Sequence, residues 1–280
     1  MGAQKAAFQI SVVAETAALE KVEFGAGLLD LIKAFETVPH HILVAIAIEL
    51  GYPLVLLRLC LASYRIRRTI GIEGVYSEPV VATRGITAGS GTATTELKLL
   101  LLPLMELLER QWANTLVAKV YVDDLTLIVR GMIGEVVDGL SDILNFVIDH
   151  LQGTLRMQVS KDKSMVVASK PAIALAIAAK VVNRTVKAAS HSKILGADTV
   201  GGTRRCTHQL RARLWQFKGK VTRFGALREV GANVMQMTRA VASPSILYAV
   251  ECIGISCSSS SSLRCRHLPA LPEPVARTLI

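Results

Sequence analysis

Three aspartates stand where their carboxylates could hold metal ions together. Asp30 lies in a short apolar run, and Asp123 and Asp124 lie between two β-forming runs at residues 116–121 and 125–129. A tight hairpin would carry the adjacent pair at its tip. Two divalent cations about 3.5–4 Å apart take hard oxygen ligands and catalyse in-line displacement at phosphorus. The three residues therefore predict a phosphoryl-transfer site, although an Asp-Asp pair by itself more often marks an ordinary turn.

The elements that would position these residues mix helices with short strands. Periodicity and turn residues predict helices over residues 7–20, 136–151 and 171–182, two helices within 40–64 joined at 51–53, and one helix after 83–93. Strands are expected at 28–31, once Gly25 and Gly27 have broken the first helix, at 157–168 and 192–202, and in hairpins at 67–81 and 116–129. A helical and basic segment then runs to residue 250.

Composition favours an intracellular globular protein of one large domain or two smaller ones. The chain has 280 residues, of which 51% are hydrophobic. Its two most apolar stretches are each interrupted by charged residues or proline, so they predict buried helices and no membrane span. No secretory signal opens the sequence. The five cysteines are scattered, and a zinc site from Cys257, Cys265 and His267 is a weaker interpretation than thiols in a loose tail.

Positive charge is concentrated near the C-terminal end. Residues 201–250 contain nine basic residues and one acidic residue, Glu229. The net charge of this segment is therefore nine minus one, or +8, and the net charge of the whole chain is +10. Clustered Lys and Arg release counterions when they neutralise phosphates, so a polyanion is a natural partner. A solvated helix face would explain the charge equally well.

Two segments around the aspartates resemble reverse transcriptases. Residues 121–124, Tyr-Val-Asp-Asp, resemble the YxDD box of that family, and residues 29–40 resemble the segment in which the first catalytic Asp precedes Ala-Phe-Asp-x-Val. The resemblance implies that Asp30, Asp123 and Asp124 are catalytic metal carboxylates and that the carbonyl of Leu31 is a further ligand. It also implies that Phe35 lies under the nucleotide sugar and excludes a 2′ hydroxyl, although a core aromatic is the simpler interpretation of Phe35 alone.

Three further segments follow in the order that the same family has. Residues 84–90 resemble the Arg-Gly-x-Pro-Gln-Gly-Ser loop, with Thr87 and Ala88 in place of Pro and Gln, and Gly91 replaces a second Pro. Residues 159–164 resemble the segment ending in Lys-Ser, and residues 193–196 resemble a short Leu-Gly strand. The resemblance implies the following roles: substrate binding by Arg84, Gly85, Gly89, Ser90 and Tyr121, protonation or screening of the leaving pyrophosphate by Lys163, and primer binding by Leu195 and Gly196.

The resemblance implies a whole architecture and activity. We expect an α+β right-hand polymerase palm, an antiparallel sheet with packed helices, together with part of the fingers at residues 28–200. An N-terminal helix, the remnant of the fingers, is expected at 1–27, a mostly helical, basic thumb at 201–253 and a low-complexity tail at 254–280. The implied activity is RNA-directed DNA synthesis in a non-LTR retrotransposon, with two Mg²⁺ ions (Mn²⁺ as a substitute), an RNA template, a DNA primer, deoxynucleoside triphosphates and a nuclear location.

Two alternatives remain open from the sequence. Only Lys5 and Lys21 supply basic residues ahead of Asp30, where the family has triphosphate-gripping finger strands, so the chain resembles a truncated form. One alternative is therefore a catalytically inactive element fragment that binds nucleic acid non-specifically. A two-metal nuclease is weaker, because nothing resembling a nuclease motif accompanies the carboxylates.

Overall fold

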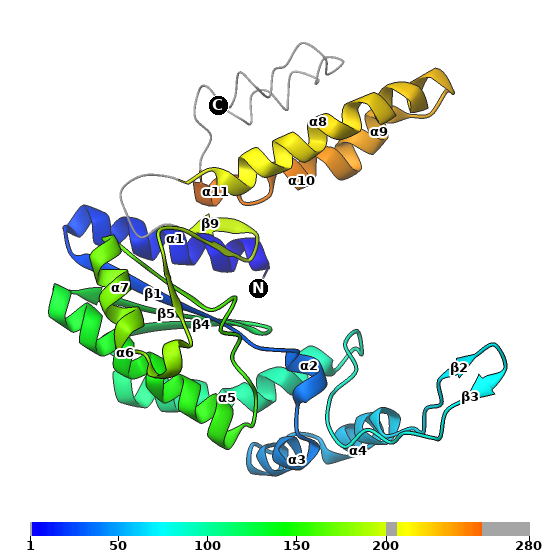
Figure 1. The fold of residues 1–280 in the computed structure, drawn as a ribbon, viewed down its shortest axis with the longest axis horizontal. Helices are drawn as coiled ribbons and strands as arrows, with labels where there is room; N and C mark the ends of the chain where they lie inside the picture. The colour runs from blue at the N-terminus through cyan, green and yellow to red at the C-terminus, as the bar shows by residue number, and fades with distance from the viewer. Residues whose placement is uncertain (1, 200–205, 254–280) are drawn as a thin grey trace. The chain divides into compact units, whose positions relative to one another are not determined.

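The computed structural model describes residues 2–199 and 206–253 (Figure 1). The chain divides into two compact units. Of the described residues, the larger contains Ala14–Ser192, and the smaller contains residues 2–13, Lys193–Thr199 and residues 206–253. The expected tail at 254–280, the glycines at 201 and 202, Arg204, Arg205 and the zinc candidates Cys257, Cys265 and His267 lie outside the described residues. The palm, fingers and thumb divisions stay a prediction.

A five-stranded sheet forms the centre of the larger unit. Its strand order is β4-β5-β1-β6-β7, and every neighbouring pair is antiparallel except β6 and β7. The strand bounds are β1 Glu23–Asp30, β4 Leu116–Tyr121, β5 Asp124–Gly131, β6 Met165–Ala168 and β7 Lys187–Ala189. The expected hairpin at residues 116–129 is confirmed as β4 and β5. The order places β1 between the hairpin and β6.

Gly25 and Gly27 lie inside β1, so the expectation that they break the first helix before a strand at 28–31 is wrong. Helix α1 (Ala3–Glu20) ends earlier, and β1 begins at Glu23. A Cβ atom on Gly25 would lie 2.8 Å from Cγ1 of Val136, and one on Gly27 would lie 2.6 Å from Cδ2 of Leu144. The two glycines therefore allow helix α6 to approach the strand closely.

Three helices of the larger unit pack against the sheet through apolar faces (Figure 1). Their bounds are α5 Ala93–Trp112, α6 Ile133–Asp149, which continues into η1 His150–Thr154, and α7 Pro171–Lys180, which precedes η2 Val182–Arg184. On α5 the buried residues recur every three or four positions, which presents one stripe to the core. The expected helices at 136–151 and 171–182 are confirmed, with shifted ends.

A second group of elements leads from β1 to α5. It comprises α2 Ala34–Thr37, α3 His40–Glu49, α4 Leu54–Tyr64 and a small hairpin of β2 Gly71–Ile72 and β3 Val75–Tyr76. Helix α4 buries Leu57, Leu61 and Tyr64, which lie on one face by their spacing. Every residue from 65 to 81 is exposed. The hairpin arm therefore extends from the end of α4 with no buried residue of its own.

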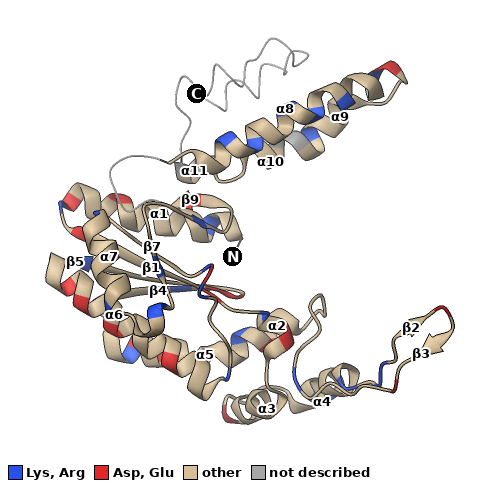
Figure 2. Cartoon of the chain, viewed as in Figure 1, with Lys and Arg blue, Asp and Glu red and all other residues tan. Residues whose placement is uncertain are grey.

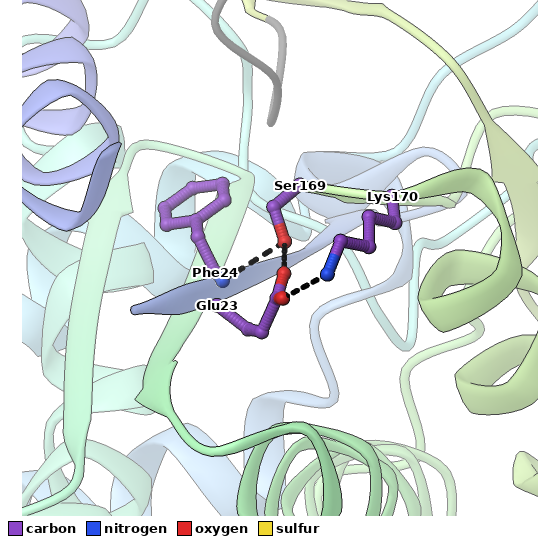
Figure 3. A network of polar contacts seen from close by, with 4 residues as sticks. All are labelled: Glu23, Phe24, Ser169 and Lys170. Carbon is purple, nitrogen blue, oxygen red and sulfur yellow. Dashed lines mark hydrogen bonds and ion pairs between the residues drawn. The ribbon is translucent and has the colours of Figure 1, made fainter. Parts of the chain in front are cut away.

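Polar contacts fix the end of β1 that lies farthest from Asp30 (Figure 3). The Ser169 hydroxyl donates to the Glu23 carboxylate and accepts from the amide of Phe24 at 3.3 Å, and the Lys170 ammonium also donates to Glu23. These bonds tie β1 to the end of β6. Because a one-residue slip would turn every side chain of β1 to the other face, they help to set where Asp30 lies.

The smaller unit combines a short hairpin with helices. It includes α1 as far as Val13 and all but the first residue of β8 (Ser192–Ile194), and its other elements are β9 Ala197–Thr199, α8 His208–Glu229, α9 Val234–Met237, η3 Thr238–Ala242, α10 Ser243–Leu247 and α11 Val250–Ile253. One strand was expected at 192–202, and that expectation is wrong because Leu195 (φ +48°) and Gly196 (φ +83°) form a turn. Two successive positive φ values suit the tight turn of a hairpin. In the described ranges, 2–199 and 206–253, no helix is both long and apolar enough to cross a membrane.

Candidate active site

Asp30 and Asp124 are direct cross-strand neighbours at the end of the sheet. The antiparallel pairing of β1 with β5 puts Asp30 opposite Asp124, and the pairing of β4 with β5 puts Tyr121 opposite Asp124. Val122 and Asp123 then form the two-residue connection of the hairpin. Side chains directly opposite in antiparallel strands share one face, with Cβ atoms about 4.5–5.5 Å apart. The structure therefore brings together the carboxylates that the sequence predicted to converge.

The hairpin connection is strained at Val122. Its φ is +59°, whereas a β-branched residue rarely adopts a positive φ. Glycine usually occupies the first central position of a hairpin turn with this backbone sign. Such strain costs about 1–3 kcal/mol and occurs mainly at functional sites, where the surrounding structure holds it in place. Here β4 and β5 on both sides hold the turn that carries Asp123.

A loop after η1 holds the backbone of Asp30 on both sides. The amide of Asp30 donates to the Ser164 hydroxyl at 3.1 Å, and its carbonyl accepts from the amide of Ser160 at 2.8 Å. The adjoining bridge between Leu31 and Val159 is completed by the Ile32 amide donating to Gln158 at 2.8 Å. These bonds use the carbonyls of Asp30 and Gln158. They leave the carbonyl of Leu31, the predicted further ligand, outside the bridge.

The same loop brings a cation to the carboxylates. Nζ of Lys163 lies 3.4 Å from Oδ2 of Asp30, which is an ion pair, although this buried oxygen has no hydrogen-bond partner. Burial, and after it the charges of Asp123 and Asp30, together raise the pKa of Asp124 to about 6, with Lys163 opposing the rise. Repulsion among the acids shows that their side chains share one environment. A positive charge placed between them would relieve it.

The donor set fits hard divalent cations. Carboxylate oxygens are the ligands that Mg²⁺ and Mn²⁺ prefer. The buried Oδ2 of Asp30 accepts no hydrogen bond. Among the residues that the structure describes, no three His, Cys, Asp or Glu side chains stand close enough to enclose an ion as they are. Asp30, Asp123 and Asp124, with the backbone oxygen of Leu31, are the residues that could hold one if their side chains moved closer together.

The loop that carries Arg84, Gly85, Gly89 and Ser90 is docked on the segment just after Asp30. The amide of Gly85 donates to Val38 and that of Ile86 donates to Phe35, both at 2.7 Å. Gly85 has a φ of +91°, and a Cβ atom there would lie 2.7 Å from the backbone oxygen of Glu36. Only glycine allows this approach. Phe35 and the loop are thus neighbours, and their nucleotide contacts stay a prediction.

The turn of Leu195 and Gly196 belongs to the smaller unit. The Tyr248 hydroxyl donates to the carbonyl of Leu195 at 2.6 Å, and Arg213 of α8 donates to the carbonyls of Gly196 and Tyr248. Arg213 also lies over the Tyr248 ring, 5.1 Å from its centroid. Figure 2 shows Lys and Arg recurring along α8, which contains one acidic residue, Glu229. The predicted primer-binding turn is therefore fixed directly to a basic helix.

Sequence reasoning assigned no role to Ser160, Ser164 or His40. Ser164 and His40 are at most 1% exposed, and both bond to segments that contain predicted site residues. All three residues lie inside the segments that resemble the family. That place could have indicated a structural role, because a buried polar side chain is normally hydrogen-bonded to a neighbouring segment. Which partner each one finds depends on the tertiary structure.

Comparison with known proteins gives one family and one fold. Residues 8–198 match the family described as reverse transcriptase (RNA-dependent DNA polymerase). Telomerase from Candida albicans in complex with a TWJ fragment of telomeric RNA has a TM-score of 0.52 at 11% identity over 99% of this chain and 54% of that chain. Apo telomerase from Candida tropicalis, truncated from its C-terminal domain, has a TM-score of 0.50 at 12% identity over 72% of this chain and 39% of that chain.

These likenesses establish the fold and leave the subtype open. The mixed α+β polymerase fold with an antiparallel-rich sheet, expected from the sequence, is confirmed. The chain spans 39% and 54% of the lengths of these two telomerase chains. No match is found among curated proteins.

Proposed function

The chain belongs to the reverse transcriptase (RNA-dependent DNA polymerase) family, and from this premise we propose that it extends a DNA primer along an RNA template. The observation that carries the proposal is the cross-strand pair of Asp30 and Asp124 beside Asp123, with a buried Asp30 oxygen that lacks a hydrogen bond. Nucleotidyl transfer needs positioning and charge neutralisation more than covalent chemistry. Three acids held at the ends of paired strands suit both the positioning of the reactants and the binding of neutralising cations.

Asp30, Asp123, Asp124 and the carbonyl of Leu31 would hold two Mg²⁺ ions, with Mn²⁺ as a substitute. Such ions, when bound, lower the negative charge on the transferring phosphoryl group and activate the attacking 3′ hydroxyl. The chain's own contribution is to fix Asp30 through Ser160 and Ser164 and to present Lys163 beside it. We propose that Lys163 screens or protonates the leaving pyrophosphate.

The remaining predicted residues would bind the other reactants. Phe35 and the loop from Arg84 to Ser90 would contact the incoming deoxynucleoside triphosphate, because the loop is bonded to the backbone of Phe35. The Leu195 and Gly196 turn, fixed to α8, would contact the primer end. The basic residues of α8 would contact the duplex backbone, since Lys and Arg neutralise phosphates without reading sequence.

The non-LTR retrotransposon origin and the nuclear location are finer parts of the proposal. They are supported by the order of the matched segments, Asp30 with Phe35, then 84–90, 121–124, 159–164 and 193–196. The two telomerases are less than 25% identical to this chain, so they support the fold alone.

Primer extension tests the proposal. Purified wild type should extend a DNA primer on an RNA template with Mg²⁺ or Mn²⁺, and Asp123→Asn should lower the rate by about 100-fold or more. Asp138→Asn is the matched control, because this exposed carboxylate on α6 pairs with Lys180 away from the three acids. If the Asp123 and Asp138 variants extended the primer equally, the assigned site would be wrong.

One observation favours the second candidate, a nucleic-acid-binding fragment without catalysis. Thr87 and Ala88 stand where the family has Pro and Gln. If this is the true state, wild type should bind primer-template with a steep salt dependence and extend nothing. The double variant Thr87→Pro with Ala88→Gln distinguishes the cases, because restored extension would mean that the carboxylate site is intact and the loop alone is deficient.

A further inference from the structure

We propose that Tyr64 and Arg65, at the end of α4, are positioning residues that fix both ends of the loop from Arg84 to Thr92, called the nucleotide loop below. The inference rests on the proposed function, in which this loop binds the incoming deoxynucleoside triphosphate. Tyr64 and Arg65 lie outside all the short segments whose residues resemble the motifs of the family. Their contacts supply the argument.

Arg65 acts on the first end of the nucleotide loop through His40. Its Nε donates to Nδ1 of His40 at 3.2 Å, and Nε2 of His40 lies 2.7 Å from the carbonyl of Gly85. Since Nδ1 accepts from Arg65, the ring proton stays on Nε2 and is donated to Gly85. His40 is 1% exposed, so in the folded chain its two ring nitrogens bond to these protein groups. Arg65 therefore fixes the tautomer that holds Gly85.

Tyr64 holds the other end of the same loop. Its hydroxyl donates to Oε2 of Glu96 at 2.9 Å and lies 3.4 Å from the hydroxyls of both Ser90 and Thr92. Glu96 is 0% exposed, and its Oε1 has no hydrogen-bond partner. A buried carboxylate with a single donor of this kind depends strongly on that donor. Loss of the Tyr64 hydroxyl would leave Glu96 unpaired beside the start of α5.

Two consecutive residues thus control the loop from its two ends. The exposed hairpin arm begins at the next position, Ile66, and all residues from 65 to 81 are exposed. A displacement of the arm would reach Gly85 through Arg65 and reach Ser90 through Tyr64. The expected role is to hold the nucleotide loop ready for substrate, so the KM for the deoxynucleoside triphosphate should depend on these residues more than kcat does.

Kinetics of Arg65→Ala and Tyr64→Phe test the substrate part of the inference. We expect KM for the nucleotide to rise roughly 3- to 10-fold, with kcat within about twofold, as for the loss of one hydrogen bond. Arg67→Ala is the matched control, since Arg67 is exposed two residues along the same segment. Arg65→Lys should recover part of the loss by donating to His40. An Arg65→Ala variant with the kinetics of Arg67→Ala would overturn the role.

Hydrogen exchange tests the anchoring without any activity. The amides of Gly85 and Ile86 donate to Val38 and Phe35, so they should be protected in wild type. Arg65→Ala should speed their exchange at least about threefold relative to Arg67→Ala, and amides in the middle of α5 should not change. Unchanged exchange would overturn the anchoring. If wild type extended no primer, the proposed function would fail, yet this measurement would still decide the anchoring.

Discussion

Asp30 and Asp124 face each other directly across β1 and β5, and Lys163 lies 3.4 Å from the first of them. Residues far apart in the sequence thus meet at one sheet edge because β1 pairs with β5 on one side and with β6 on the other. The arrangement accumulates negative charge that one lysine only partly offsets.

Asp124→Asn should stabilise the fold at pH 8. Burial and the neighbouring charges of Asp123 and Asp30 raise the pKa of Asp124 from 3.8 to about 6, so the folded state disfavours the ionised carboxylate. Between pH 3.8 and pH 6 the folded chain binds more protons than the unfolded chain, so the stability of the wild type falls as pH rises. Above pH 6 the full destabilisation by the ionised Asp124 is present. Because the side chain is partly exposed, we expect a gain on the order of 1 kcal/mol.

Denaturant unfolding from pH 3 to pH 8 measures this effect. The difference in stability between Asp124→Asn and wild type should shrink as pH falls from 6 and close below the ordinary pKa of 3.8, where the carboxyl is protonated in both the folded and the unfolded chain. A gap that stayed constant over the whole range would contradict the assigned cause. Asp138→Asn, at an exposed position, should show no such trend.

Glu23→Gln should have the opposite pH dependence. Hydrogen bonds from Lys170 and then Ser169 lower the pKa of Glu23 below 4.5, so its stabilising contribution is present above pH 4.5 and is lost as pH falls through the folded-state pKa (Figure 3). At pH 7 the variant should lose about 1 kcal/mol, since Lys170 remains exposed. Thermal unfolding at pH 7 and pH 3 checks this, and an equal loss at both values would refute it.

Gly27→Ala should destabilise the larger unit, although alanine normally suits a strand better than glycine. The new Cβ atom would lie 2.6 Å from Leu144 Cδ2, so the Leu144 side chain or helix α6 must shift away from β1. Overpacking of this kind costs about 1–3 kcal/mol. Gly134→Ala is the control, because nothing lies within 4 Å of its Cβ position in α6 and the helix should gain stability. If the two substitutions changed the free energy of unfolding equally, the close approach of α6 to β1 at Gly27 would be contradicted.

Gly85→Ala and Gly89→Ala separate backbone strain from steric contact. Both glycines have a φ of +91°, but only at Gly85 would a Cβ atom meet the backbone oxygen of Glu36, at 2.7 Å. In both variants the left-handed backbone should lower the free energy of unfolding by about 1 kcal/mol. The steric contact should lower it by about 1–3 kcal/mol more in Gly85→Ala. Denaturant titration measures both. If Gly89→Ala were as destabilised as Gly85→Ala, contact with Glu36 would not be the cause.

The carboxylate site could be predicted from sequence because its signals are local. Two β-forming runs around Val-Asp-Asp predict a hairpin, and the structure has β4 and β5 there. A short strand at 28–31 that contains Asp30 was also expected, and the pairing of β1 with β5 follows from packing that no local pattern describes. Local signals therefore identified the carboxylates, and only the tertiary structure shows that they are neighbours.

The errors occurred where a residue serves a distant partner. Gly25 and Gly27 look like helix breakers in sequence, yet they are strand residues that admit Val136 and Leu144. Leu195 and Gly196 look like a strand, yet contacts from Tyr248 and Arg213 hold a turn. In each case the partner is more than 15 residues away, and no local periodicity encodes it.

Mn²⁺ binding to the folded chain tests the central claim most directly. Electron paramagnetic resonance titration at pH 7.5 should show Mn²⁺ bound by wild type and by Asp138→Asn alike, and bound at least about tenfold more weakly by Asp30→Asn. That result would mean that the acids at the ends of β1 and β5 hold the ion. Equal Mn²⁺ affinity in the wild type and Asp30→Asn would contradict the account.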